Sequence, residues 1–414
     1  MVEGRLEAVR AVLEAAGLAG QPGATPTSLP LRRFPEVHFA RIFVLEEATL
    51  SSGRHVPASL VYMADVDGSV DEHLRALVDR AAAGVDELFG DCEGYPGPGG
   101  GDVARLTWLH SHRLTPAAYY VHTVGRTVQQ IRDEARLFET LGDIVDSGEV
   151  TTSGVAPAKL RRRLRDGVLR RSGFDWVKRP PAGPGTLHRL RDTIHLYATL
   201  AVLFLLAPFA VIPLAVWLVL VRLAELTDPQ EDGVPDQEHV DEVRRFEDWC
   251  VQNPFTAVGE VKAGVVRRVT MRVALAGLGF ACRHSFAHDN LAGVTSIHFA
   301  RWVPLDDGER LIFASSYDGS LESYMDDFIS RLAWGINLVF SNGVGFPKAR
   351  WLVLGGARDE IRYKHYLRRH QVPTTVFYSA YPELSAPVLD RIRAVRSGIN
   401  ARDEASAASW LARL

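Results

Sequence analysis

Four residues in the last third of the chain have side chains that could do chemistry together: His298, Arg301, Tyr317 and Asp318. An imidazole can ligate iron, and a carboxylate or guanidinium beside it can move protons or stabilise developing charge. His298 and Arg301 belong to the sequence IHFAR, whereas Tyr317 and Asp318 end a strand-like run. Whether these side chains share a site depends on the strands that carry them.

The sequence His-Phe-Ala-Arg occurs twice, at 38–41 and at 298–301. In each copy a strand pattern, the tripeptide Asp-Gly-Ser and a helical pattern follow in the same order. A Gly-aromatic-Pro tripeptide then stands at the same distance from Asp-Gly-Ser in both copies. Because unrelated segments rarely keep such an offset, the sequence predicts an ancient duplication of residues 30–148 and 294–400.

Each copy mixes alternating strand patterns with amphipathic helices, which is typical of an α+β unit with helices on one face of an antiparallel sheet. A strand containing Trp108 or Trp351, a Tyr-rich strand and a final helix are expected to complete the copies. A sheet with one covered face needs a partner for its other face, and the second copy can supply it. The sequence therefore predicts two ferredoxin-like two-layer halves that form a pseudo-symmetric barrel or sheet stack.

This layout resembles the α+β barrel superfamily that includes dye-decolourising peroxidases and chlorite dismutase-like haem proteins. The resemblance covers both copies in layout only, and the GxxDG segment of those families is represented here by no more than Tyr317-Asp318-Gly319. It implies haem as a candidate cofactor with His298 as the axial ligand. Asp318, Arg301 and Tyr317 are then the candidate catalytic residues. The alternative role for His298 is that of a hydrogen-bonded core or interface histidine.

The strand register limits which of these side chains can meet. Asp307-Gly308 predicts a two-residue hairpin turn, and counting outward from it pairs His298 with Tyr317. Since side chains alternate along a regular strand, His298 and Tyr317 are expected on one face and Arg301 on the other.

The first copy differs from the second in its charged partners. Arg41 is expected to gain Asp65 as a carboxylate partner, whereas His38 has no tyrosine at the matching position. The arginine of each copy could also simply tie a strand to the start of the neighbouring helix. Asp67 and Asp318 could likewise be turn or N-cap residues.

An apolar segment separates the two copies. Residues 194–221 contain no Asp, Glu, Lys or Arg, which is the signature of a bilayer-embedded segment. As one straight helix this stretch would be about 42 Å long, against a hydrocarbon core of about 30 Å. Pro208 and Pro213 near its middle predict a kinked span or a hairpin. We expect a monotopic hairpin turning at 207–213, because a single tilted span would place the copies on opposite sides of the membrane.

The flanks of this segment differ in charge. Basic residues precede it in KLRRRLRDGVLRRSGFDWVKR and acidic residues follow it, which predicts binding to anionic lipids and a cytoplasmic location for the bulk of the chain. A later stretch carrying Arg267, Arg268 and Arg272 either lies on the same interface or forms an ordinary packed helix.

The sequence thus divides into segments whose expected roles follow the chain. They are an N-terminal helix at 1–29, the first repeat at 30–148, a basic linker at 149–193, the membrane segment at 194–224, an acidic linker with an amphipathic helix at 225–293, the second repeat at 294–400 and a C-terminal tail at 401–414.

Composition excludes several classes of function. A net charge of −3 gives no general attraction to nucleic acid, and three scattered cysteines predict neither a disulfide framework nor a zinc knuckle. We therefore expect a membrane-associated oxidoreductase, haem-dependent and peroxidase-like, that acts on a lipophilic small molecule. The alternative is a non-catalytic lipid-binding or membrane scaffold protein.

Overall fold

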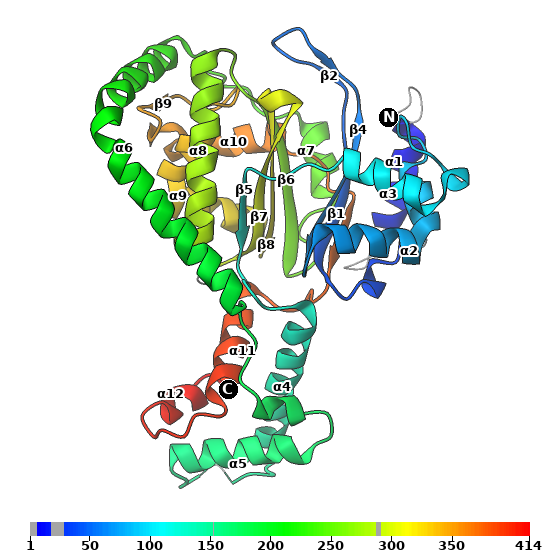
Figure 1. The fold of residues 1–414 in the computed structure, drawn as a ribbon, viewed down its shortest axis with the longest axis vertical. Coiled ribbons are helices and arrows are strands. Elements are labelled where there is room, and N and C mark those ends of the chain that lie inside the picture. Colours follow the sequence, from blue (N-terminus) through cyan, green and yellow to red (C-terminus); the bar gives the residue numbers. More distant parts are fainter. Residues whose placement is uncertain (1–5, 18–28, 152, 287–290) are drawn as a thin grey trace.

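The computed structural model describes residues 6–17, 29–151, 153–286 and 291–414, which form a main body above a helical base (Figure 1). The described residues form four antiparallel sheets, two of them with only two strands; the two larger sheets have strand orders β11-β1-β4 and β5-β7-β8-β6. The strands of the first sheet are β1 (Val37–Leu45), β4 (Ser59–Val66) and β11 (Val376–Ser379). Those of the second are β5 (Ala118–Val121), β6 (Gln252–Glu260), β7 (Ile297–Leu305) and β8 (Arg310–Asp318). The predicted mixture of helices and antiparallel sheets is confirmed.

Each sheet contains one strand from the distant part of the sequence. β11 pairs with β1, and β5 pairs with β7, both antiparallel. The regions before and after the apolar segment therefore share both sheets and lie in one body. The two copies therefore meet, which differs from the alternative in which a single tilted span keeps them apart.

The β7–β8 hairpin follows the predicted register for most of its length. Asp307 and Gly308 both have positive φ, and the Glu309 N–H donates to the Asp306 carbonyl at 3.1 Å, as a two-residue hairpin turn requires. The predicted pairing of His298 with Tyr317 is wrong.

A β-bulge at His298 causes this error. Ile297 pairs with Tyr317 and Phe299 with Ser316, so His298 is the extra residue between them. β1 has the same irregularity at His38. A bulge ends the strict alternation of side chains, so the argument that placed His298 on the face opposite Arg301 does not hold.

Helices cover the outer face of each sheet. Those beside the first sheet are α1 (Leu6–Gly17), α2 (Val70–Phe89) and α3 (Gly101–Ser111). Those beside the second are α8 (Val265–His284), α9 (Leu321–Phe340) and α10 (Glu360–His370), with α7 (Gln237–Arg244) next to α10. The strands expected at Trp108 and Trp351 are wrong, since Trp108 is in α3 and Trp351 is in the turn between β9 (Ala349–Arg350) and β10 (Leu354–Gly355).

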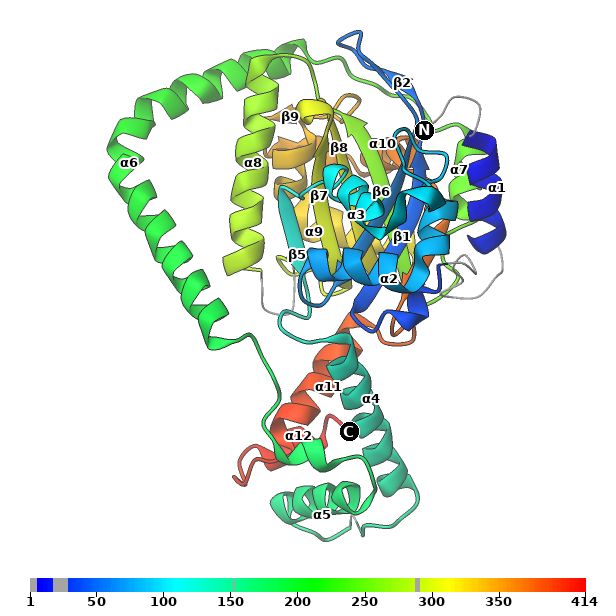
Figure 2. The same cartoon turned by 45° about the vertical axis from the view of Figure 1, so that its right-hand side comes forward.

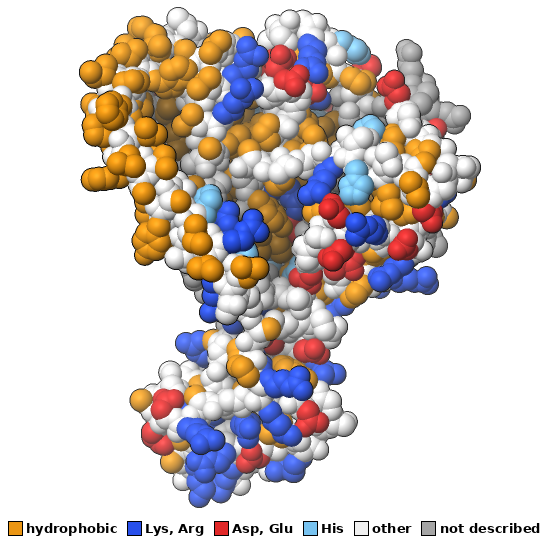
Figure 3. Space-filling model, in the orientation of Figure 1, with side chains coloured by type: hydrophobic (Ala, Val, Ile, Leu, Met, Phe, Trp, Pro, Cys, Tyr) orange, Lys and Arg blue, Asp and Glu red, His pale blue; other side chains and the backbone are white. Residues whose placement is uncertain are grey.

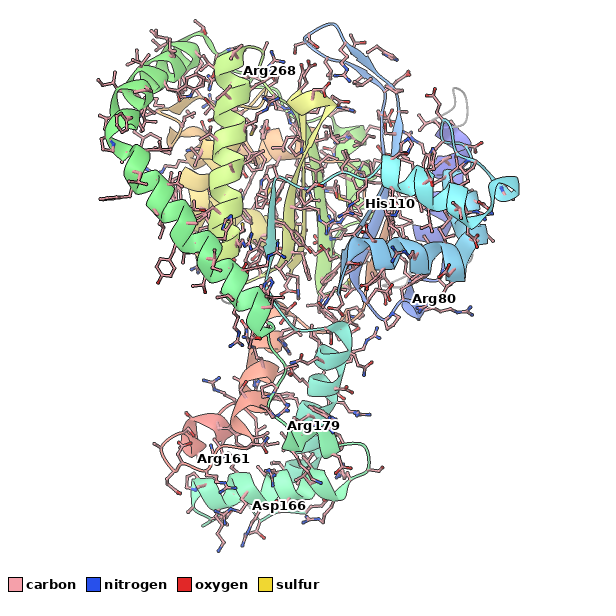
Figure 4. All side chains as sticks on the ribbon, viewed as in Figure 1. Arg80, His110, Arg161, Asp166, Arg179 and Arg268 are labelled. Carbon is pink, nitrogen blue, oxygen red and sulfur yellow. The ribbon has the colours of Figure 1, made fainter. Side chains whose placement is uncertain are left out.

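The base is a small helical cluster below the sheets. It consists of α4 (Val128–Asp146), α5 (Pro157–Arg170), α11 (Ala386–Gly398) and α12 (Ala407–Leu411). The basic segment predicted as a linker thus contains α5, whose Arg161 is buried and donates to the Ser406 hydroxyl at 2.9 Å. Figure 4 shows Arg161 and Arg179 within this base.

The apolar segment forms one continuous helix, α6 (Thr186–Thr227), of 42 residues. The predicted hairpin is wrong. Pro208 and Pro213 each remove a helical hydrogen bond, yet the helix bends around the outside of α8 without reversing (Figures 1 and 2). Its middle stands away from α8 in Figure 2, so α6 forms an arch.

Both ends of the arch are tied to the body. Near the start, Arg283 of α8 donates from Nε to Asp192 at 2.8 Å. Near the end, the Glu225 carboxylate accepts the N–H groups of Trp351 and Leu352, both at 2.8 Å.

Neighbouring α8 packs against the second sheet, and two of its arginines bond within the body. Its Arg267 is buried and donates to Asp228 at 2.7 Å, while Arg272 donates to the Asp307 carbonyl at 3.2 Å. Arg268 lies at the upper end of α8 in Figure 4.

Candidate functional site

His298 lies between the two sheets and is fully buried. Its Nε2 donates to Oδ1 of Asp318 at 2.7 Å. The other oxygen of Asp318 accepts the N–H of Ala386, at the first residue of α11, at 2.6 Å. A carboxylate is favoured there because the first N–H groups of a helix have no partner within the helix. This histidine–aspartate pair therefore joins the bulge in β7 to a helix of the base.

The first copy repeats the arrangement. Nε2 of His38 donates to Oδ1 of Asp67 at 3.0 Å, and Oδ2 of Asp67 accepts the N–H of Val128, at the start of α4, at 2.9 Å. The Tyr381 hydroxyl also contacts Nδ1 of His38 at 2.8 Å. The predicted N-cap role of the two aspartates is wrong, since Thr127 and Ser385 are the N-cap residues of α4 and α11. Asp67 and Asp318 instead accept the N–H of the residue that follows each of these caps.

The aromatic rings of the two copies pack crosswise. Phe39 lies 5.3 Å from the ring of His298, and Phe299 lies 5.5 Å from the ring of His38, between centroids. Phe39 and Phe299 meet at 5.4 Å in an edge-to-face contact. Such contacts stabilise the interface beyond the burial of apolar area.

Arg301 reaches from β7 across to the first sheet. Its Nη2 donates to the Ala64 carbonyl at 3.1 Å and to the Asp65 carboxylate on β4. The prediction that Asp65 pairs with Arg41 is therefore wrong. The reason is that the two sheets face each other. Arg301 on β7 therefore reaches Asp65 on β4 of the first sheet, while Arg41 on β1 reaches the second sheet.

Arg41 makes the reciprocal crossing from β1. Its guanidinium donates to the carbonyls of Phe255 and Ser315, both at 2.8 Å, and to the Ser316 hydroxyl at 2.7 Å. Its acceptors in these bonds are neutral. The alternative role expected for the two arginines, which was to bind a strand to the start of the neighbouring helix, is wrong. Both bind strands of the opposite sheet.

The two arginines differ in electrostatics. Burial lowers the pKa of Arg41 to about 10, with Asp65 opposing the shift. Burial also acts on Arg301, but the charge of Asp65 raises the pKa of Arg301 above its ordinary value. Tyr119 donates its hydroxyl to Asp65 at 2.8 Å, and burial followed by the Asp65 charge raises the pKa of Tyr119 well above 10.

The four predicted site residues are only partly brought together. His298 and Asp318 are bonded, while Arg301 faces the same layer and bonds elsewhere. Tyr317 lies on the helix-covered face and stacks on Tyr324 with centroids 4.1 Å apart. The Tyr-rich strands predicted before α4 and α11 were the available signal for the residues that the sequence reasoning missed, which are Tyr119, His122 and Tyr381.

The residues around His298 do not fit a haem. Its Nε2 is used by Asp318, and its Nδ1 has no hydrogen-bond partner among the described residues. The ring is nevertheless enclosed by those of Phe39, His122 and Tyr381, with centroids 5.3, 6.4 and 6.4 Å away. A porphyrin would have to displace this packed aromatic layer. The arrangement supports the alternative expectation of an interface histidine.

The other unusual surface is the arch itself. Among the described residues, α6 is long and apolar enough to cross a membrane, and its most apolar stretch is not buried in the protein. The side chains of Phe204, Phe209 and Ile212 are 79, 78 and 75% exposed. Figure 3 shows apolar side chains covering this part of the molecule. A contiguous exposed patch of this kind marks a surface that meets a partner or a membrane.

Basic residues gather on the base. The exposed members on α5 are Lys159, Arg162, Arg163 and Arg170. Figure 3 shows Lys and Arg side chains at the lower end of the molecule, below the arch.

Comparison with known proteins gives no match to a family model, to a curated protein or to a solved structure.

Proposed function

We propose that the protein is a monotopic membrane-surface protein that binds lipid, with α6 lying in the plane of the bilayer interface. The observation that carries this proposal is a helix whose apolar side chains are exposed along its middle while both of its ends are bonded to one body.

The tethered ends explain why the helix lies in the plane. A straight helix of 42 residues would span about 63 Å, which is twice the thickness of a hydrocarbon core of about 30 Å. A crossing helix would also carry one end to the far side, away from the body that holds it. An arch that dips into one leaflet buries its apolar side chains and keeps both ends in place.

Charge supports the choice of lipid and of leaflet. Each Lys or Arg near an anionic surface contributes about 1 kcal/mol to binding. The exposed basic residues of α5 precede the arch in sequence, as expected for a segment on the cytoplasmic side. We therefore propose an anionic, cytoplasmic leaflet as the partner.

Duplication is the second part of the proposal. It is supported by reciprocity, since each copy places a bulged histidine on an aspartate at a helix start and sends an arginine to the opposite sheet. An isolated bridge between Ala257 and Gln371 brings the edge strand β6 toward the segment before β11. This contact supports the barrel-like layout expected from the resemblance.

Vesicle sedimentation tests the membrane proposal. The double variant Phe204→Ser/Ile212→Ser should lose at least about tenfold in affinity for vesicles containing anionic lipid, because each large side chain contributes roughly 1.5–3 kcal/mol when buried. The matched control is Val103→Ser/Leu114→Ser, whose side chains are 79 and 59% exposed on or just after α3. Equal binding by the two double variants would contradict the proposal.

The oxidoreductase function expected from the sequence remains a separate prediction. Its test is the visible spectrum of purified protein. A Soret band that disappears in His298→Ala would support it, whereas a protein without such a band would leave the membrane-surface function alone.

A further inference from the structure

A cavity of about 610 Å³ lies between the first half of α6, the second half of α8 and the edge strand β5. This volume falls within the roughly 300–1,000 Å³ of small-molecule sites. Its walls are mainly apolar and small, and include Ala117, Ala118, Val121, Val124, Ala276 and Phe280. We call this space the arch cavity.

Polar side chains of α6 and α8 line one part of the arch cavity, and most of them are basic. Arg283 donates to Asp192 at 2.8 Å, and His188 contacts the same carboxylate at 3.1 Å. His195 lines the cavity as well, with its Nδ1 2.8 Å from Nε2 of His284. Asp192 thus contacts one guanidinium and one imidazole, and the imidazole of His195 lines the same cavity, which leaves donors for an added anion.

These donors remain accessible. The side chain of Arg283 is 40% exposed and that of His188 is 58% exposed, whereas Asp192 is only 25% exposed. When His284 donates to Nδ1 of His195, the proton of His195 resides on Nε2, which is then a further donor.

We propose that the arch cavity binds one amphiphile with a single hydrocarbon chain and an anionic head group, either a carboxylate or a phosphate. The chain occupies the apolar walls, and the head group binds Arg283 in competition with Asp192. This inference rests on the proposed function, because the ligand enters from the bilayer in which the arch lies. Tyr197 and Leu200, which follow the polar rim on α6, are 66 and 46% exposed and continue the apolar surface toward the lipid.

Native mass spectrometry of protein released from a neutral detergent tests the site. Added oleate and added lysophosphatidate represent the two head groups, and monooleoylglycerol is the neutral comparison. We expect a one-to-one adduct with at least one of the two anionic probes and at least about tenfold weaker binding of the neutral probe, because a charge-assisted hydrogen bond is lost. The preferred anionic probe identifies the head group. Equal binding of all three probes would overturn the proposal.

Filling the cavity gives the second test. Ala276 lines the arch cavity and is exposed, so Ala276→Trp should occupy the space and reduce the adduct at least about tenfold. Val273→Trp, on the same helix at a side chain that is 65% exposed, is the matched control and should keep the adduct. Retention of the adduct by Ala276→Trp would overturn the proposal.

The ion pair between Asp192 and Arg283 provides a third test, in which two variants should change the amount of anionic adduct in opposite directions. Asp192→Asn and Arg283→Gln both break the same ion pair, so a purely structural role predicts the same effect from both. The proposal predicts stronger anionic adducts for Asp192→Asn, which frees Arg283, and weaker ones for Arg283→Gln. Effects of the same sign would overturn it.

Vesicle binding distinguishes a failure of the arch cavity proposal from a failure of the proposed function. Ala276→Trp should sediment with vesicles like the unaltered protein while losing the adduct. If the arch variants fail to weaken vesicle binding, the proposed function fails. If they weaken it but no anionic adduct forms with the unaltered protein, only the arch cavity proposal fails.

Discussion

The two His-Phe-Ala-Arg strands have the same geometry and different electrostatics. In each, the histidine occupies a bulge and bonds an aspartate at a helix start, and the arginine crosses to the other sheet. Arg41 is held by neutral acceptors, whereas Arg301 is held by Asp65. The crossing itself is therefore the shared feature, while Asp65 bonds Arg301 and acts on Arg41 only through its charge.

The histidines differ in the same way. Both ring nitrogens of His38 are bonded, to Asp67 and Tyr381. His298 bonds Asp318 through one nitrogen, and its other nitrogen has no partner within the described part of the chain. The first copy therefore has the more fully hydrogen-bonded histidine, whereas the second copy has the arginine that bonds a carboxylate.

The largest effect on stability is expected when the Asp65 carboxylate is removed. Asp65→Ala should lower the free energy of unfolding by about 3–5 kcal/mol, because it leaves buried guanidiniums without a counter-charge. Ser316→Ala, at the matching position of β8, removes only a neutral acceptor of Arg41 and should cost about 1 kcal/mol. Denaturant unfolding in neutral detergent measures both. Equal losses of unfolding free energy would show that the Asp65 carboxylate stabilises the fold no more than a neutral acceptor does.

A smaller effect distinguishes the histidines. His38→Phe and His298→Phe each leave an aspartate without its imidazole, but only His38→Phe also removes the partner of the Tyr381 hydroxyl. We expect His38→Phe to be the more destabilising by about 1 kcal/mol. Thermal unfolding of the two variants side by side measures the difference, and the reverse order would contradict the bonding pattern.

The smallest expected effect is a loss of stability at acid pH. His73 of α2 contacts Tyr62 and Glu36, whereas the matching position of α9 is Tyr324, which bonds Ser315. Burial lowers the pKa of His73, with Glu36 opposing the shift. The unfolded chain therefore binds more protons below its ordinary histidine pKa of about 6.5, and stability falls as the pH falls.

His73 should lower the melting temperature as the pH falls from about 7.5 to about 5.5. His73→Gln should flatten this part of the pH dependence of the melting temperature. Tyr324→Phe is the control from the other copy and should leave the slope unchanged. A slope that persists in His73→Gln would assign the acid sensitivity to another group.

The sequence predicted what local patterns determine. The turn at Asp307-Gly308 followed from residues that tolerate positive φ, and the helix after each Asp-Gly-Ser followed from its helical pattern. The bulges at His38 and His298 could not be predicted, because one extra residue in a strand leaves no mark in an alternating pattern.

Long-range features were also beyond the sequence. The exchange of β5 and β11 between the sheets depends on edges that meet only after folding. The path of α6 was mispredicted because Pro208 and Pro213 permit either a bend or a reversal, and the contacts at the helix ends decide between them. Of the candidate site, the His298–Asp318 pair could have been found from the Asp-Gly-Ser spacing had the bulge been known.

The position of β11 has a consequence for biosynthesis. β1 leaves the ribosome before α6 and before every strand of the second sheet, but its neighbour β11 follows all of them. One side of β1 must therefore stay unpaired while the remaining segments, α6 included, emerge. Strand edges that wait in this way are prone to aggregation and fold slowly. Under the proposed function, contact of α6 with a lipid surface during translation would keep the nascent chain soluble until β11 arrives.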